Sequence, residues 1–171
     1  MSRLLDFYCG SATDGEGRWL RDLWQWDDDE LEAVHDFIQW MFPLPEPSQF
    51  NPDAPLLTAG DIASFHADET LRANLGCSFK RILVFLGLTQ EGGRITQGPN
   101  FAARAADVWT TANHNWLRIT RILRSLTLLG LESEAQGLYA CLNGFYKSRR
   151  FPIPESTFRY WTGAVQSDSL G

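Results

Sequence analysis

Two arginines and a histidine within residues 113–129 have the types and spacing needed to hold an anion. A helix over this segment turns by about 100° per residue, which places one narrow polar stripe on it: His114, Arg118, Arg121 and Ser125. Isoleucines and leucines fill the broad opposite face. Two guanidinium groups one turn apart, close to a helix N-terminus, can offer bidentate donors to a phosphate or a carboxylate. We interpret the stripe as a candidate anion site, with arginines paired to acids of an earlier helix as the structural alternative.

The earlier helix is predicted over about residues 28–42. Acidic residues open it, where negative charge favours the helix dipole. Apolar residues then follow a helical period: Leu31, Val34, Ile38 and Met41. On one continuous helix His35 and Gln39 would be neighbours on the polar side, together with Glu32 and Asp36. We expect His35 and Gln39 to lie close to the stripe, forming the floor of a pocket or an ion network in which the arginines pair with Glu32 or Asp36.

The common catalytic and metal-binding signatures are missing. The sequence has no phosphate loop of the GxxxxGK type, no HExxH, no GxSxG and no Cys/His zinc pattern. The three histidines lie far apart along the chain, as do the three cysteines, which we interpret as reduced thiols in the core. The sequence therefore predicts no catalytic residue, no metal site and no cofactor.

Composition bounds the class of protein. The 171 residues are 44% hydrophobic and 21% charged, typical of one globular domain in the cytoplasm. No stretch approaches the roughly 20 apolar residues of a membrane-spanning helix. A net charge of −6 and a pI near 5.0 exclude non-specific nucleic-acid binding. Residues 1–69 hold 15 acids and 3 bases, whereas residues 70–171 hold 6 acids and 12 bases. The two halves are expected to face each other in the fold or across a homodimer, or the basic half faces an anionic partner.

Helix signals predict an all-α fold: a compact single domain over residues 1–171, built as a bundle of six or seven helices. Besides the two segments above, helices are expected at about 58–66, 68–86, 100–109, 132–147 and 155–165. Residues 88–100 are predicted to form a polar, glycine-rich loop, and residues 166–171 a short polar tail. The many prolines between Pro43 and Leu57 predict an extended strap after the first long helix, anchored by Phe42, Phe50 and Leu56.

Two blocks of sequence resemble a known family. Residues 35–43, His-Asp-Phe-Ile-Gln-Trp-Met-Phe-Pro, continue with Pro47-Ser48, Asn51-Pro52, Ala54 and Leu57-Thr58. This block closely resembles the N-terminal conserved region of the opioid growth factor receptor family. Residues 113–126, Asn-His-Asn-Trp-Leu-Arg-Ile-Thr-Arg-Ile-Leu-Arg-Ser-Leu, with Leu129-Gly130-Leu131, resemble the family's second block in the same order. The resemblance spans about residues 20–150.

The resemblance implies a soluble helical binding module with receptor activity at the level of the family. That family is named for a vertebrate receptor of the enkephalin pentapeptide, and the compact chain looks like a microbial member. The two blocks together supply the candidate ligand-binding residues: His35, Gln39, Asn113, His114, Asn115, Arg118 and Arg121. The expected partner is an unidentified small anion, peptide or protein.

Two other functions stay open. An interaction scaffold would dock a partner on an aromatic face. An enzyme acting on a small anionic substrate would use His35 or His114 as acid–base and the two stripe arginines as anion clamps. A pocket lined by both histidines and both arginines would favour a binding module or an enzyme, whereas an exposed aromatic patch would favour a scaffold.

Overall fold

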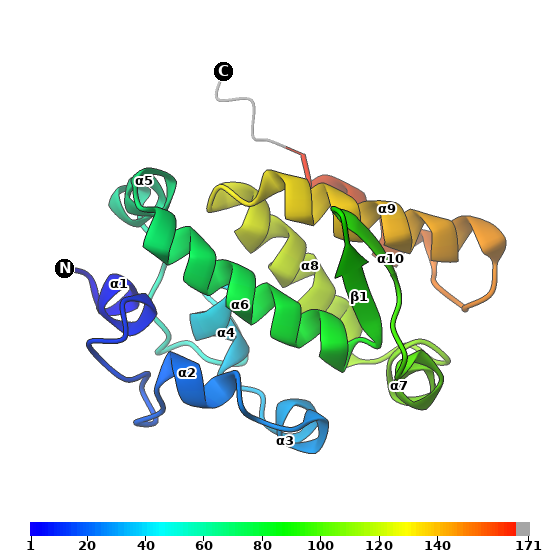
Figure 1. Cartoon of the computed structure of the whole chain (residues 1–171), viewed down its shortest axis with the longest axis horizontal. Helices are drawn as coiled ribbons and strands as arrows, with labels where there is room; N and C mark the ends of the chain where they lie inside the picture. The colour runs from blue at the N-terminus through cyan, green and yellow to red at the C-terminus, as the bar shows by residue number, and fades with distance from the viewer. Residues whose placement is uncertain (167–171) are drawn as a thin grey trace. The chain divides into compact units, whose positions relative to one another are not determined.

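The computed structural model describes residues 1–166 (Figure 1). Within these residues the elements follow in this order: α1 (Arg3–Tyr8), α2 (Leu20–Leu23), α3 (Asp28–Ala33), α4 (Ile38–Met41), α5 (Ala59–Ala67), α6 (Glu69–Phe85), β1 (Leu88–Glu91), β2 (Arg94–Gln97), α7 (Phe101–Val108), α8 (His114–Leu128), α9 (Glu132–Ser148) and α10 (Glu155–Ala164). The chain divides into two compact units, with the boundary inside α6, between Arg81 and Ile82.

The described chain is mostly helical, as predicted. Six of its helices have seven or more residues, which agrees with the six or seven expected. The expectation of an all-α fold is wrong in one place, because the predicted loop at 88–100 contains an antiparallel hairpin of β1 and β2. Gly92 and Gly93 connect the strands with φ of 57° and 81°. A two-residue turn with both φ values positive matches the twist of a hairpin, so this glycine pair was the overlooked signal.

Side-chain caps fix the starts of several helices in the first unit. Ser2 accepts a hydrogen bond from the Leu5 N–H at the start of α1. Thr58 and Asp61 form the predicted capping box of α5. Asp68 accepts from the Thr70 N–H at 2.8 Å, which starts α6 where the sequence indicated. The local signals at Thr58 and Asp68 explain why the starts of α5 and α6 could be predicted closely, whereas α1 was not predicted.

The helix predicted over residues 28–42 is wrong as one element. α3 ends at Ala33, Val34 has extended backbone with ψ of 130°, and α4 begins only at Ile38. The Asn51 side chain donates to the Asp36 carbonyl at 2.8 Å, and the Asp36 carboxylate pairs with Arg18 at 2.8 Å. These contacts from distant segments hold the backbone in the break, which a helical period in the sequence cannot show.

The proline-rich segment 43–57 contains no helix or strand. Of its three predicted anchors, Phe42 is fully buried, whereas Phe50 is 72% exposed and Leu56 is 47% exposed. The anchoring role of Phe50 and Leu56 is therefore wrong. Leu57 is buried instead, and its N–H donates to the Leu44 carbonyl at 3.0 Å.

In the second unit, α8 packs against α9 and α10, and β2 lies against α9 (Figure 1). An aromatic cluster joins α7, α9 and the segment before α10: Phe101, Trp109, Phe145 and Phe151. Trp109 and Trp161 are fully buried. The aromatic load of the sequence thus fills the core of this unit, since rings contribute large buried areas.

Three further predictions concern thiols, membrane segments and the tail. The cysteines are free, but Cys9 and Cys77 are exposed and Cys141 is half-buried, so their placement in the core was wrong. Over residues 1–166, no helix has the length and apolar character to cross a membrane. The predicted polar tail begins at Gln166, and its remaining residues lie outside the described part of the chain.

Candidate functional site

The second motif block forms α8, and Asn113 fixes its start. Asn113 has extended backbone, and its Oδ1 accepts from the Asn115 N–H at 2.9 Å. Its Nδ2 donates to the carbonyls of Val108 and Thr111 at 2.9 and 2.7 Å. All three hydrogen bonds bind Asn113 to nearby backbone. Asn113, predicted as a ligand-binding residue, therefore acts as a helix cap that places the side chains after it.

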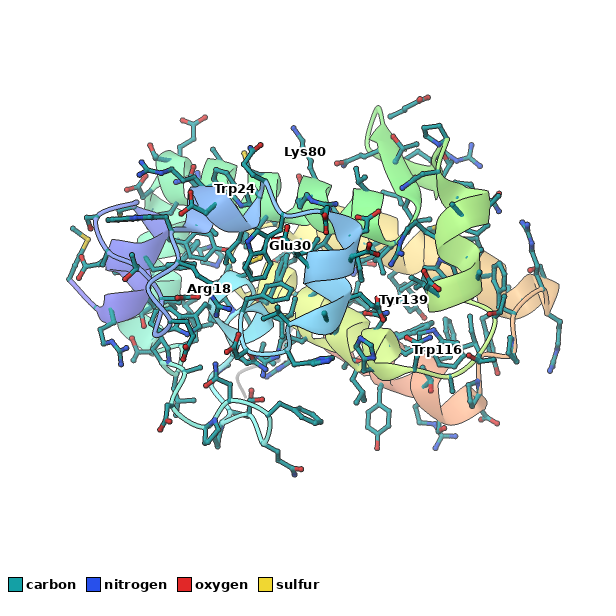
Figure 2. All side chains as sticks on the ribbon, turned by 90° about the horizontal axis from the view of Figure 1, so that it is seen from below. Arg18, Trp24, Glu30, Lys80, Trp116 and Tyr139 are labelled. Atoms are coloured by element: carbon teal, nitrogen blue, oxygen red, sulfur yellow. The ribbon has the colours of Figure 1, made fainter. Side chains whose placement is uncertain are left out.

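Indole N–H groups tie α8 to its neighbours. Trp116 donates to the Val108 carbonyl at 2.8 Å, and Trp161 of α10 donates to the Trp116 carbonyl at 3.1 Å. The two rings meet edge to face with centroids 6.4 Å apart, and Trp116 is labelled near α10 in Figure 2. Buried indoles with satisfied donors hold α8 in one position within its unit, as a preformed site requires.

Two guanidinium groups lie over one phenyl ring. Arg104 of α7 and Arg118 of α8 approach the Phe85 ring with Cζ to centroid distances of 4.6 and 6.0 Å. Arg104 also donates to the Phe85 carbonyl at 2.7 Å and pairs with Asp107 at 3.0 Å. Arg118 is 8% exposed and donates to Asn115 Oδ1 at 3.3 Å, and Asn115 itself is fully buried. The second unit thus holds two cationic groups largely out of water.

Arg104 and Phe85 were missed by the sequence analysis, although a signal for Arg104 exists. The residues of α7 that turn toward the core are Phe101, Arg104 and Val108, at helical spacing. An arginine on an otherwise apolar stripe must find partners when it is buried, which marks it for attention. Nothing in the sequence around Phe85 distinguishes this ring from other core aromatics.

The first motif block lies in the first unit and does not have the predicted arrangement. His35 is exposed in the break between α3 and α4, whereas Gln39 lies in α4 with 4% exposure. The amide of Gln39 donates to Ser48 Oγ at 3.4 Å. Because the helix is interrupted, His35 and Gln39 are not neighbours on one helical face.

The Asp36 carboxylate forms an ion pair within the first unit. Its carboxylate pairs with Arg18, whose guanidinium also pairs with Asp14 at 2.7 Å and lies over the Trp26 ring at 5.4 Å. Figure 2 labels Arg18 and Trp24 in this unit. The pKa of Arg18 is raised: burial alone would lower it, but hydrogen bonds and charge from Asp36 and Asp14 outweigh that effect. The Asp36 carboxylate thus has a charged partner within its own unit.

The structure brings Asn113, Asn115 and Arg118 together at the start of α8, with His114 and Arg121 on the same helix. His35 and Gln39 belong to the other unit. Their approach to the α8 stripe remains a prediction.

Comparison with known proteins assigns the family. The model of the opioid growth factor receptor (OGFr) conserved region matches residues 5–169. The chain belongs to this family. No solved structure matches the chain.

Vertebrate relatives support the assignment. Over 119 residues the chain is 39% identical to the mouse opioid growth factor receptor, an alignment covering 66% of this chain and 18% of that protein. The human receptor is 37% identical over 123 residues, which cover 68% of this chain and 18% of the receptor. Opioid growth factor receptor-like protein 1 of Xenopus tropicalis is 37% identical over 116 residues, or 67% and 22% of the two chains. The chain thus spans about a fifth of the length of these relatives. The comparisons do not support a microbial origin.

Proposed function

We propose that this chain is a ligand-binding domain of the opioid growth factor receptor family, in which α8 supplies a subsite for an anionic group. Arg118 and Arg121 donate to the anion, and Asn115 orients Arg118 through its side-chain oxygen. The observation that carries the proposal is that Arg118 and Arg121 lie one turn apart on α8, where Asn115 holds the nearly buried Arg118 guanidinium by a hydrogen bond.

The charge of α8 supports an anionic ligand. The helix holds three arginines and one histidine among its 15 residues and contains no Asp or Glu. Arg118 is nearly buried and donates to Asn115 Oδ1 at 3.3 Å. A guanidinium that is largely shielded from water interacts more strongly with an anion than one in bulk water does, because screening is weaker there.

The names of the relatives support receptor-type binding. The mouse and human relatives are named opioid growth factor receptor. Because this chain matches about a fifth of each, we propose only that binding resides in the shared region, and that a carboxylate or phosphate on the ligand meets the stripe on α8.

Thermal unfolding in the presence of simple anions tests the proposal. Sodium phosphate should raise the melting temperature above that in sodium chloride of equal ionic strength, because a ligand that binds only the folded chain stabilises it. The double variant Arg118→Gln, Arg121→Gln should lose this response and remain folded.

Arg159→Gln is the matched control. Arg159 is exposed on α10 and pairs with Glu155 at 2.9 Å, so its loss removes a cation from the same unit but not from α8. This variant should keep the full response to phosphate. A parent protein that responds equally to phosphate and to chloride would rule out the subsite. A double variant that unfolds, with no phosphate response in the parent, would assign the stripe to a structural ion network.

A further inference from the structure

A groove of about 840 Å³ lies between β2 and α9, entirely within the second unit. Figure 1 shows the hairpin beside α9. One side is formed by the turn and strand of residues 92–97, and the other by a face of α9: Gly137, Ala140, Cys141, Gly144 and Phe145. No lining residue belongs to α8, so the groove is separate from the anion subsite proposed above.

The α9 wall of the groove is formed mostly by small residues, which leave space between the helix and β2. Gly137, Cys141 and Gly144 are spaced to share one helical face. A Cβ at Gly137 would lie 3.1 Å from the Gly93 carbonyl oxygen, so helix and hairpin turn touch at this position. A Cβ at Gly144 would meet nothing within 4 Å. The groove therefore starts where Gly137 touches the turn and is open at Gly144.

The β2 side presents backbone groups for hydrogen bonding. The Gly98 N–H donates to the Gly87 carbonyl at 2.8 Å, and Thr89 pairs with Thr96 in the same register. Hydrogen-bonded pairs alternate along an antiparallel ladder, so Ile95 and Gln97 direct their N–H and C=O groups away from β1. These groups have no hydrogen-bond partner within residues 1–166.

The size and pattern of the groove fit an extended chain. From Gly137 to Gly144 the axis of α9 rises about 10 Å, the length of about three residues of a strand. The side chains of a strand paired with β2 would alternate between the two faces of the sheet. Those on the face of Ile95 would meet the small residues of α9, and those on the opposite face would lie beside Arg94. Arg94 is exposed and is the one charged residue of the lining.

We propose that this groove binds an extended peptide that pairs as a third strand with β2, with apolar residues toward α9 and acidic residues toward Arg94. Adding a strand to an exposed sheet edge is an established way to bind peptides, with affinity from the backbone and selectivity from alternate side chains. Charge complementarity favours acidic residues in this peptide, because Arg94 is the charged residue among those that line the groove.

A short synthetic peptide tests the proposal directly. The probe is a fluorescein-labelled peptide of alternating valine and glutamate, and binding to the full chain is measured by fluorescence anisotropy. A peptide of alternating valine and lysine should bind at least about tenfold more weakly than the valine and glutamate peptide. The valine and glutamate peptide with methylated backbone nitrogens on its β2 side should also lose binding, because it cannot donate to the strand.

Matched glycine variants place the binding in the groove. Gly144→Leu fills the open floor, whereas Gly163→Leu adds the same side chain to α10, where a Cβ also meets nothing within 4 Å. Gly144→Leu should weaken peptide binding at least about tenfold and Gly163→Leu should leave it unchanged, since only the first side chain takes the place of the peptide. Circular dichroism melts check that both variants fold.

If Gly144→Leu does not fold, Arg94→Glu provides a second test of peptide binding in the groove. Arg94 is exposed, and its replacement should shift binding from the glutamate peptide to the lysine peptide. Arg118→Gln, Arg121→Gln should bind the peptide as the parent does, which separates this groove from the anion subsite. Equal binding of the methylated peptide, no preference between the two peptides, or a dimer of the parent that Gly144→Leu dissociates would each overturn the proposal.

Discussion

The two motif blocks carry equally clear helical patterns and fold differently. In the second block, residues 114–128 form one helix, as their periodicity indicates. In the first block, the periodicity runs through residues 28–42, but the helix breaks at residues 34–37. In α8 the cap, the apolar face and the indole hydrogen bonds all favour the same helix. In the first block, Asn51 and Arg18 hold Asp36 in a non-helical position. An amphipathic pattern therefore sets which residues are buried, while tertiary hydrogen bonds decide where the helix is continuous.

The largest expected effect is the loss of an indole that supports α8. Trp161→Ala should destabilise the chain by about 3–5 kcal/mol, because it empties a fully buried aromatic site and removes the hydrogen bond to Trp116. Urea unfolding measures the change, with Tyr160→Ala, an exposed neighbour on α10, as control. A cost below that of the control would show that α8 does not depend on this contact.

The break in the first block should respond to Asn51. Asn51→Ala leaves the Asp36 carbonyl without its donor and should cost about 1–3 kcal/mol in urea unfolding. Gln49→Ala, at an exposed position of the same segment, is the control. Were helicity by far-ultraviolet circular dichroism to increase without loss of stability, Asn51 alone would account for the break.

The start of α8 gives a smaller effect. Asn113→Ala removes the cap and should cost about 1 kcal/mol. Asn113→Asp keeps an oxygen for the Asn115 N–H and should recover much of the loss. Equal melting temperatures for the two variants would mean that the amide donors of Asn113, rather than its oxygen, hold the helix start.

The smallest effect is expected at Phe50. The sequence predicts an anchor whose loss would be costly, whereas the exposed ring predicts a change within about 0.5 kcal/mol for Phe50→Ala. Urea midpoints of the parent and the variant compare the two expectations. A loss of several kcal/mol would mean that Phe50 packs against the protein in solution.

Features with local determinants can be predicted from the sequence, whereas features that depend on distant contacts cannot. Asp68, Thr58 and Asn113 cap helices within three residues of themselves, so their sequence positions located the helix starts. The Gly92–Gly93 turn was equally local and was overlooked. The exposure of Phe50 could not be predicted, because it depends on the path of a segment without regular structure.

In the candidate site, contacts within one helix could also be predicted from the sequence, whereas contacts between separate segments could not. Asn115 and Arg118 lie three residues apart on one helix, and their contact follows from helical spacing. The approach of Arg104 to the Phe85 ring joins residues from separate helices, and no periodicity reports it. The ion pair of Asp36 with Arg18 also joins separate segments of the chain, and charge alone does not predict it.

The contact at Gly137 fixes the separation between α9 and the hairpin at one end of the groove. Helix α9 and the hairpin meet there through backbone atoms, since neither Gly137 nor Gly93 has a side chain. Rotamer changes, which alter the shape of most grooves on the nanosecond scale, cannot change the separation at this point. Alanine at position 137 would move the turn by a few tenths of an ångström, and the strand edge would shift with it. Backbone atoms therefore set the spacing between the helix and the strand, and one added methyl group is enough to alter it.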